Sequence, residues 1–149
     1  MSWYRLQICS EDNVENWREL LITLAGAGQL CVLVASALVP VRLNWKQDLA
    51  SLSRLHRQMY WTYGGYVVMA IIAFSVISLL NANELAAGGM LARSICAYIM
   101  VFWGVRLLLQ TVFDVQEHLT KWWLVAGYHS LTLLFLFFTI TYAIITFGL

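Results

Sequence analysis

The chain has 149 residues, of which 61% are hydrophobic, 14% aromatic and only 11% charged. Soluble domains carry about 25% charged residues, and a domain of this size buries only about two-thirds of the surface that its unfolded chain exposes. The composition therefore excludes a soluble globular enzyme, a disordered chain and a nucleic-acid-binding protein. It fits a small integral membrane protein, and the net charge of +1 selects no anionic or cationic partner.

Four apolar stretches predict transmembrane helices, because each reaches the ~20 residues that a helix needs to cross the hydrocarbon core of a bilayer. Three of them have no formal charge, and these cover residues 20–41, 58–83 and 122–149. The fourth stretch, 94–113, contains one charged residue, Arg106. We therefore predict four spans, at about residues 20–40, 61–81, 91–113 and 122–147.

Short connections between these spans predict an all-α protein with one membrane domain, residues 1–149, built as an antiparallel four-helix bundle. Pro40 lies near the end of the first span, and a Gly-Gly pair and two asparagines form a loop within 81–89. Residues 44–60 instead place leucine and methionine at helical spacing, with lysine, aspartate and arginine between them. This pattern predicts an amphipathic helix that lies in the membrane interface and leads into the second span; the alternative is a solvated helix beneath the bundle.

Lysine and arginine near the ends of the spans predict the orientation of the chain. The first and third connections hold five of these residues: Arg42, Lys46, Arg54, Arg57 and Lys121. The opposite side holds three: Arg5, Arg18 and Arg93. Because basic connections tend to stay in the cytoplasm, we expect the first and third connections to be cytoplasmic and both termini to lie outside.

Polar residues inside the spans form the most informative pattern in the sequence. Arg106 lies eight residues before Asp114, and His129 lies eight residues after Lys121 on the next span. At 1.5 Å per residue, both lie about 12 Å from the same membrane surface. Three further polar residues lie at a similar depth on the first and second spans: Ser36, Tyr63 and Tyr66. Gln110 lies one turn from Arg106 on the same span.

This polar layer has two interpretations. In the first, Arg106 extends its stem to the interface, and His129 bonds a neighbouring helix and fastens the bundle. In the second, the layer lines a pocket for a lipid or a quinone. Arg106 would then hold an anionic or carbonyl group, and His129, Tyr63 and Tyr66 would form hydrogen bonds. An ionisable residue within a span is by default a candidate functional residue.

A second cluster of polar residues suggests metal or haem binding at the cytoplasmic edge of the membrane. Its candidate ligands are His56, Asp114, Glu117 and His118. Nitrogen and oxygen ligands of this kind suit several transition metals, and residues 114 and 118 would share one face of a helix. Against a metal site, the sequence has no HExxH motif. Only His129 lies well within a span, so a haem deep in the bundle would lack a second histidine, and no cofactor is required.

The residue inventory favours a protein without catalytic activity. No span contains Asp or Glu, and no cysteines have CxxC spacing. Small residues offer flat surfaces on which helices pack closely in lipid, and they lie at 25–28, Gly64, Gly65, Gly104 and Gly127. We therefore expect an accessory or structural subunit whose partners are the lipid bilayer and either other membrane subunits or further copies of itself. A lipid- or quinone-binding protein or enzyme is the alternative.

Overall fold

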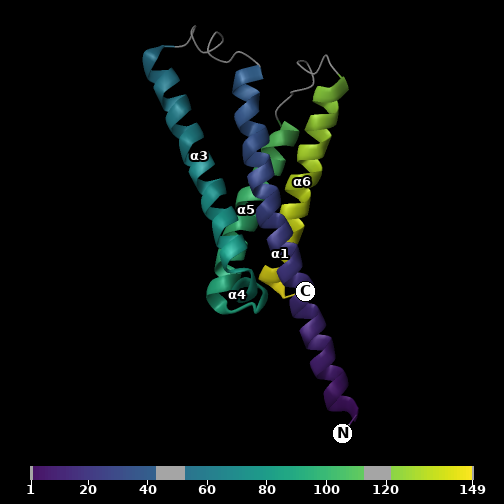
Figure 1. The fold of residues 1–149 in the computed structure, drawn as a ribbon. Helices are drawn as coiled ribbons and strands as arrows, with labels where there is room; N and C mark the ends of the chain where they lie inside the picture. The colour runs from purple at the N-terminus through teal and green to yellow at the C-terminus, as the bar shows by residue number, and fades with distance from the viewer. Residues whose placement is uncertain (1, 43–52, 113–121, 149) are drawn as a thin grey trace.

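The computed structural model describes residues 2–42, 53–112 and 122–148, with side chains placed for 14–36, 53–112 and 125–148. Within these residues lie four long helices and one short one (Figure 1): α1 (Ser2–Arg42), α3 (Arg54–Leu80), α4 (Ala82–Ala86), α5 (Met90–Val112) and α6 (Trp122–Phe147). Each long helix contains a segment that is long and apolar enough to cross a membrane. These segments are Val14–Ser36, Arg54–Leu80, Met90–Val112 and Val125–Phe147. The predicted all-α architecture with four spans is confirmed.

The start of α3 lies earlier than the predicted start of the second span. Ser53 caps the helix, because its side-chain oxygen accepts a hydrogen bond of 3.5 Å from the backbone N–H of His56. Residues 54–60, expected in a separate interfacial helix, therefore continue directly into the span. The rest of that expected helix, 44–52, lies outside the described residues.

The loop expected within 81–89 contains the short helix α4. Three of its five residues, Ala82, Leu85 and Ala86, are buried, and α4 packs against α1. Gly88 follows with a φ of 70°, a left-handed conformation that favours glycine. The connection between the second and third spans is therefore a packed structure that closes one end of the bundle (Figure 1).

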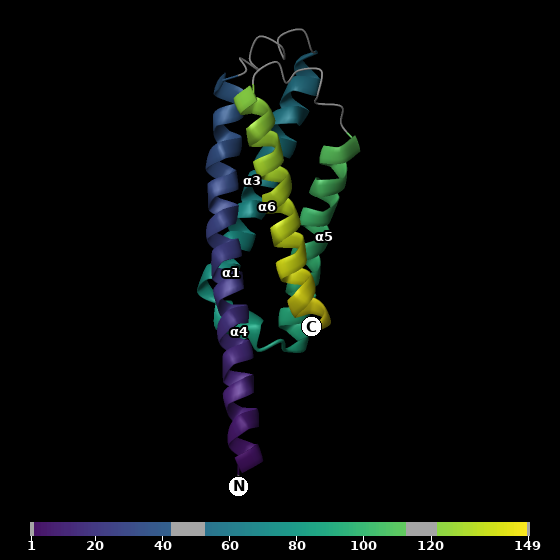
Figure 2. The ribbon, with the colours of Figure 1, turned by 90° about the vertical axis from the view of Figure 1, so that its right-hand side faces the viewer.

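Burial divides the bundle into a closed end beside α4 and an open end opposite. At the closed end every long helix contributes buried residues, within 22–32, 71–78, 92–103 and 135–145. At the open end no described side chain is buried, and this end comprises residues 33–36, 53–70, 104–112 and 125–134. Figure 1 shows α3 leaning away from α1 and α6 toward the open end, and Figure 2 shows α6 beside α1 and in front of α3.

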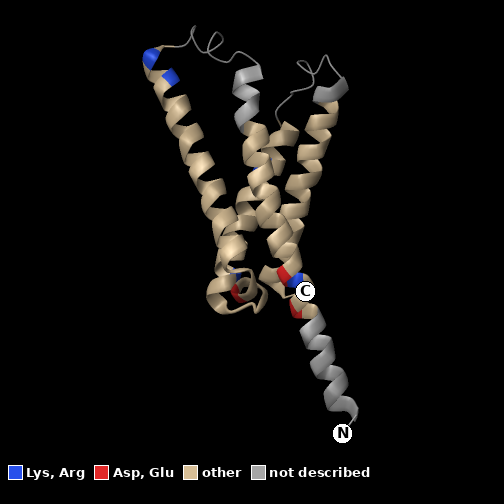
Figure 3. Cartoon of the chain, in the orientation of Figure 1, with Lys and Arg blue, Asp and Glu red and all other residues tan. Residues whose placement is uncertain are grey.

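Charged residues lie mainly near the ends of the spans (Figure 3). Arg54 and Arg57 begin α3 at the open end. Near the closed end lie Glu15, Arg18, Glu19, Glu84 and Arg93. Arg106 is the one formally charged residue in the four apolar stretches of the sequence. The structure therefore keeps the predicted contrast between apolar spans and one intramembrane cation.

Glycines on α1 let this helix approach two neighbours closely. A Cβ atom added at Gly26 would lie 3.0 Å from Cγ of Leu79 on α3, and one at Gly28 would lie 2.9 Å from Cε1 of Phe138 on α6. The flat surface predicted for α1 is therefore used in packing. The other predicted glycines have only an ordinary contact or open space around them: Gly64, Gly65, Gly104 and Gly127. The close approaches predicted there are not made among the described residues.

Candidate functional site

Arg106 lies on the side of α5 that faces α3, where the two helices diverge. One turn earlier, Phe102 packs edge-to-face against Phe74 of α3, with ring centroids 5.0 Å apart. The guanidinium carbon of Arg106 lies 6.0 Å from the centre of the Phe102 ring, at the outer range of a cation–π contact. Because Phe102 lies nearer the closed end, the Arg106 side chain runs toward the middle of the span. It does not extend outward to the interface, as one interpretation of the layer required.

The surroundings of Arg106 leave its charge without a counter-charge in the part of the chain that the structure describes. The side chain is half-buried, and the ring of Phe102 is its one polar or aromatic contact among those residues. The cost of a cation within a span rises to about 2.5–3.5 kcal/mol at the bilayer centre on insertion scales, and such cations usually pair with another charge or with backbone carbonyls. Among the described residues, Arg106 is therefore the strongest candidate for binding a negatively charged or polar group that these residues do not supply.

Gln110, another residue of the predicted layer, fastens α5 to α6. Its Nε2 donates hydrogen bonds to the carbonyl oxygen of Tyr128 (3.1 Å) and to Oγ1 of Thr132 (2.8 Å). The hydroxyl of Tyr128 donates in return to the carbonyl oxygen of Gln110 (2.9 Å). These reciprocal bonds fix the two helices in one register, so the amide nitrogen of Gln110 is already used within the bundle.

His129 is not level with Arg106. The bonds of Gln110 to Tyr128 and Thr132 place Gln110 level with His129 on α6. Arg106 lies one turn nearer the middle of the bilayer, so Arg106 and His129 differ in depth by about 6 Å. The His129 ring is exposed, and it packs edge-to-face on Tyr128 with the centroids 5.6 Å apart.

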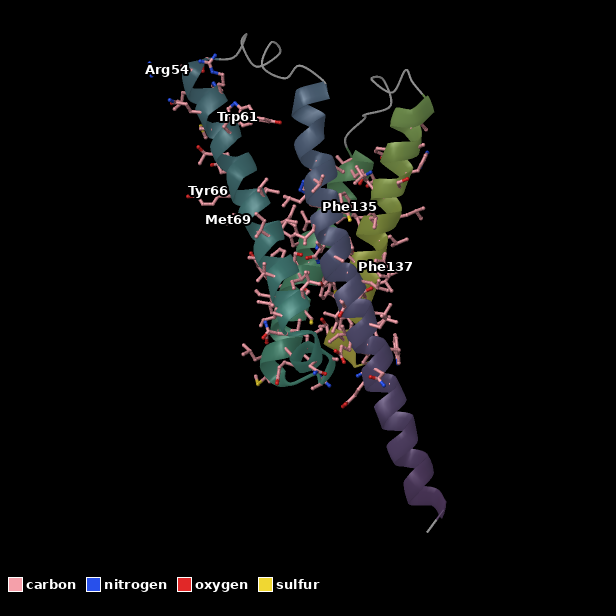
Figure 4. All side chains as sticks on the ribbon, in the orientation of Figure 1. Arg54, Trp61, Tyr66, Met69, Phe135 and Phe137 are labelled. Atoms are coloured by element: carbon pink, nitrogen blue, oxygen red, sulfur yellow. The ribbon has the colours of Figure 1, made fainter. Side chains whose placement is uncertain are left out.

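The remaining residues of the predicted layer are spread over the open end. Tyr63 and Tyr66 on α3 are 63% and 61% exposed. Figure 4 shows the side chain of Tyr66 pointing away from α1 and α6. Ser36 on α1 is half-buried, and no hydrogen bond within the described residues joins any of the three to Arg106. The structure therefore joins Gln110 to α6, but among the described residues it does not bring the other polar residues of the predicted layer into contact with Arg106.

The candidate metal ligands lie mostly outside the described residues. His56 is described, and its Nδ1 lies 2.6 Å from Oγ of Ser53 at the start of α3. Asp114, Glu117 and His118 fall in the undescribed segment 113–121. Within the described ranges, no three His, Cys, Asp or Glu side chains come together. Metal or haem binding at this edge stays a prediction.

A buried polar network at the closed end was not indicated by the sequence pattern. The hydroxyl of Tyr142 on α6 accepts a hydrogen bond of 3.0 Å from Nε2 of Gln29 on α1 and lies 2.6 Å from Oγ of Ser78 on α3. All three side chains are fully buried. Ser75 adds a bond of 2.7 Å to the carbonyl oxygen of Gly26. The available signal was Gln29, whose amide interrupts an apolar stretch and needs partners inside lipid.

The fold and the placement of charge define a small multi-pass membrane protein. Comparisons with protein-family models, with curated proteins and with solved structures find no match. The function therefore has to follow from the residues of this chain.

Proposed function

We propose that the protein is a non-catalytic subunit of a membrane assembly and that it binds its partner through the open end of α3. The exposure of every residue from 53 to 66 carries this proposal. A helical stretch of that length makes nearly four turns, so no face of it is covered by the described residues. A helix within a bundle normally buries one stripe of its surface.

The composition of this stretch suits a second transmembrane helix. Its large apolar and aromatic side chains are well exposed, including Leu55 (64%) and Trp61 (50%). Gly64 and Gly65 have nothing within 4 Å of an added Cβ. Small residues of this kind let the backbones of two helices approach closely in lipid, where packing drives association. The glycine pair therefore supports a helix as the partner.

Binding is better supported than catalysis or ligand capture. The polar side chains Gln29, Gln110 and Tyr142 bond other helices of the same bundle. Arg106 and His129, on which a lipid or quinone pocket depended, lie about one turn apart in depth. The polar groups of the spans thus serve mainly to hold helices together.

The mass of the protein extracted from its native membrane in a mild detergent tests the proposal, because the partner is then present. One chain has a mass of 17.0 kDa, and we expect a larger protein mass after subtraction of the bound detergent. Replacing Gly64 and Gly65 together by leucine should release the single chain. Gly127→Leu on α6, also in open space, is the matched control and should leave the mass unchanged. A wild-type protein that is always monomeric would contradict the proposal.

We also propose that the open end faces the cytoplasm, because the connections there hold the larger number of basic residues. In a variant without the native cysteines, Ser53→Cys lies at the open end and Gly89→Cys at the closed end, and both positions are exposed. A membrane-impermeant maleimide added to intact cells should label position 89 and not position 53. The reverse pattern would show that the orientation is inverted.

A further inference from the structure

We infer that the partner is a different protein, and that it places a transmembrane helix with an aspartate or glutamate between the open ends of α3 and α5, where the carboxylate pairs with Arg106. This inference rests on the proposed function and names the chemistry of the partner. Three observations carry it: the direction of Arg106, its depth in the bilayer, and the absence of acidic residues from the four apolar stretches of this chain.

The direction of Arg106 places its charge beside the contact between α5 and α3, at the point where α3 begins to lean away. Phe74 of α3 contacts Phe102 of α5, and also Tyr98 with centroids 5.6 Å apart. Beyond this contact α3 leans away, and all its residues from 53 to 66 are exposed. The guanidinium lies over Phe102 on the same side of α5. A helix that packs along the open end of α3 and continues as far as Phe74 would therefore also reach Arg106.

The depth of Arg106 distinguishes a protein carboxylate from a lipid phosphate. α5 runs from Met90 to Val112, which is about 35 Å at 1.5 Å per residue, against a hydrocarbon core of about 30 Å. Arg106 lies about 9 Å before Val112, the last described residue of α5, so its Cα lies inside the core, and its guanidinium points back toward Phe102. Lipid phosphates lie outside this core. An acidic side chain on a helix reaches such a depth without deforming the bilayer.

The apolar stretches of this chain give a second copy no such carboxylate. The sequence has eight acidic residues, and none lies in any of its four apolar stretches. Those with described side chains, Glu15, Glu19 and Glu84, lie near the closed end. Asp114 lies outside the described residues, eight positions after Arg106 and beyond the apolar stretch 94–113. The pairing therefore requires a different chain.

The test uses the full-length protein in phosphatidylcholine vesicles and a synthetic leucine-alanine transmembrane peptide with one glutamate at the depth of Arg106. A peptide with glutamine in that place is the matched probe, and energy transfer between labels reports binding. Interhelical polar contacts in lipid are worth up to about 2 kcal/mol. We therefore expect the glutamate peptide to bind roughly three- to thirtyfold more tightly.

Variants assign this preference to Arg106. Arg106→Gln should abolish the preference for glutamate, Arg106→Lys should retain part of it, and Arg93→Gln at the closed end should leave it intact. The charge-reversed Arg106→Glu should instead prefer a peptide with lysine. If Arg106→Gln does not fold, the two peptides on the wild-type protein still decide the question.

Equal binding of the glutamate and glutamine peptides to the wild-type protein would overturn the inference. It would also fall if phosphatidylglycerol, added to the vesicles, were retained in an Arg106-dependent manner and displaced the glutamate peptide. In either case the proposed function stands if binding of both peptides is lost when Gly64 and Gly65 are leucine. Failure of both peptides to bind, together with a monomeric protein in mild detergent, would remove the proposed function as well.

Discussion

At the scale of single residues, the hydroxyl of Tyr142 joins three helices through one oxygen atom. Gln29 on α1 donates to it, and Ser78 on α3 lies within hydrogen-bond distance. Interhelical hydrogen bonds in membrane proteins contribute only about 0.6 kcal/mol on average. A buried donor left without an acceptor is costlier, at about 1–3 kcal/mol, so this shared atom matters more than its two bonds suggest.

Tyr142→Phe should therefore lower the stability of the bundle by about 1–2 kcal/mol, because the amide of Gln29 loses its acceptor while the ring and its packing remain. Unfolding in mixed detergent micelles, followed by circular dichroism, measures the change. Tyr98→Phe is the matched control, because Tyr98 is 66% exposed and its ring contact with Phe74 survives the substitution. Equal stability of the Tyr142 variant and the wild type would show that the network contributes nothing.

The position of Arg106 within its span was predictable from the sequence, but the direction of its side chain was not. Counting residues from the ends of the spans found Arg106 as the intramembrane charge, because formal charge is visible in the sequence. The contact of its guanidinium with Phe102 depends on the rotamer, and the offset of His129 depends on the register that Gln110 sets. Rotamer and register both follow from packing between helices, which a single sequence does not display.

At the scale of elements, α1 is the helix around which the closed end is assembled. It packs against α3, α4 and α6, and its glycines permit the contacts with Leu79 and Phe138. The ring of Phe138 is fully buried and packs against Trp103, with centroids 4.8 Å apart. It has little room to move away from a larger residue at position 28.

Gly28→Ala should consequently destabilise the protein. Overpacking costs about 1–3 kcal/mol, which exceeds the gain of about 1 kcal/mol in helix propensity when alanine replaces glycine. Gly65→Ala should be neutral or slightly stabilising, because an added Cβ there meets open space. Thermal unfolding of both variants in the same detergent compares them. A Gly28 variant as stable as the Gly65 variant would show that α1 and α6 are not in close contact.

The long helices were predictable from charge-free stretches, since a span must be apolar over its whole length. α4 was not predicted, because five residues are too few to show a periodicity, and its burial comes from contact with α1. The glycine pair 64–65 was predicted to mark a close approach, and within the described residues it makes none. Small residues indicate that a helix surface can pack closely. Which helix packs against that surface depends on the arrangement of the whole bundle, which composition does not show.

At the scale of the whole molecule, the bundle is packed at one end and divergent at the other. Water would penalise the exposed apolar side chains of the open end. A bilayer does not, because lipid tails are as apolar as the side chains. The divergent arrangement can therefore persist in lipid, and shape and polar pairing decide which helix fills it. This is the basis for assigning the open end of α3 to a partner subunit.

A photo-reactive amino acid at position 63, on the exposed open end of α3, tests this assignment most directly in native membranes. A second one at position 133 is the control, because Leu133 on α6 is exposed to a similar degree, 67% against 63% for Tyr63. Irradiation should give a protein adduct of one discrete mass from position 63, and lipid adducts from position 133. Lipid adducts alone from both positions would contradict the assignment of α3 as the subunit interface.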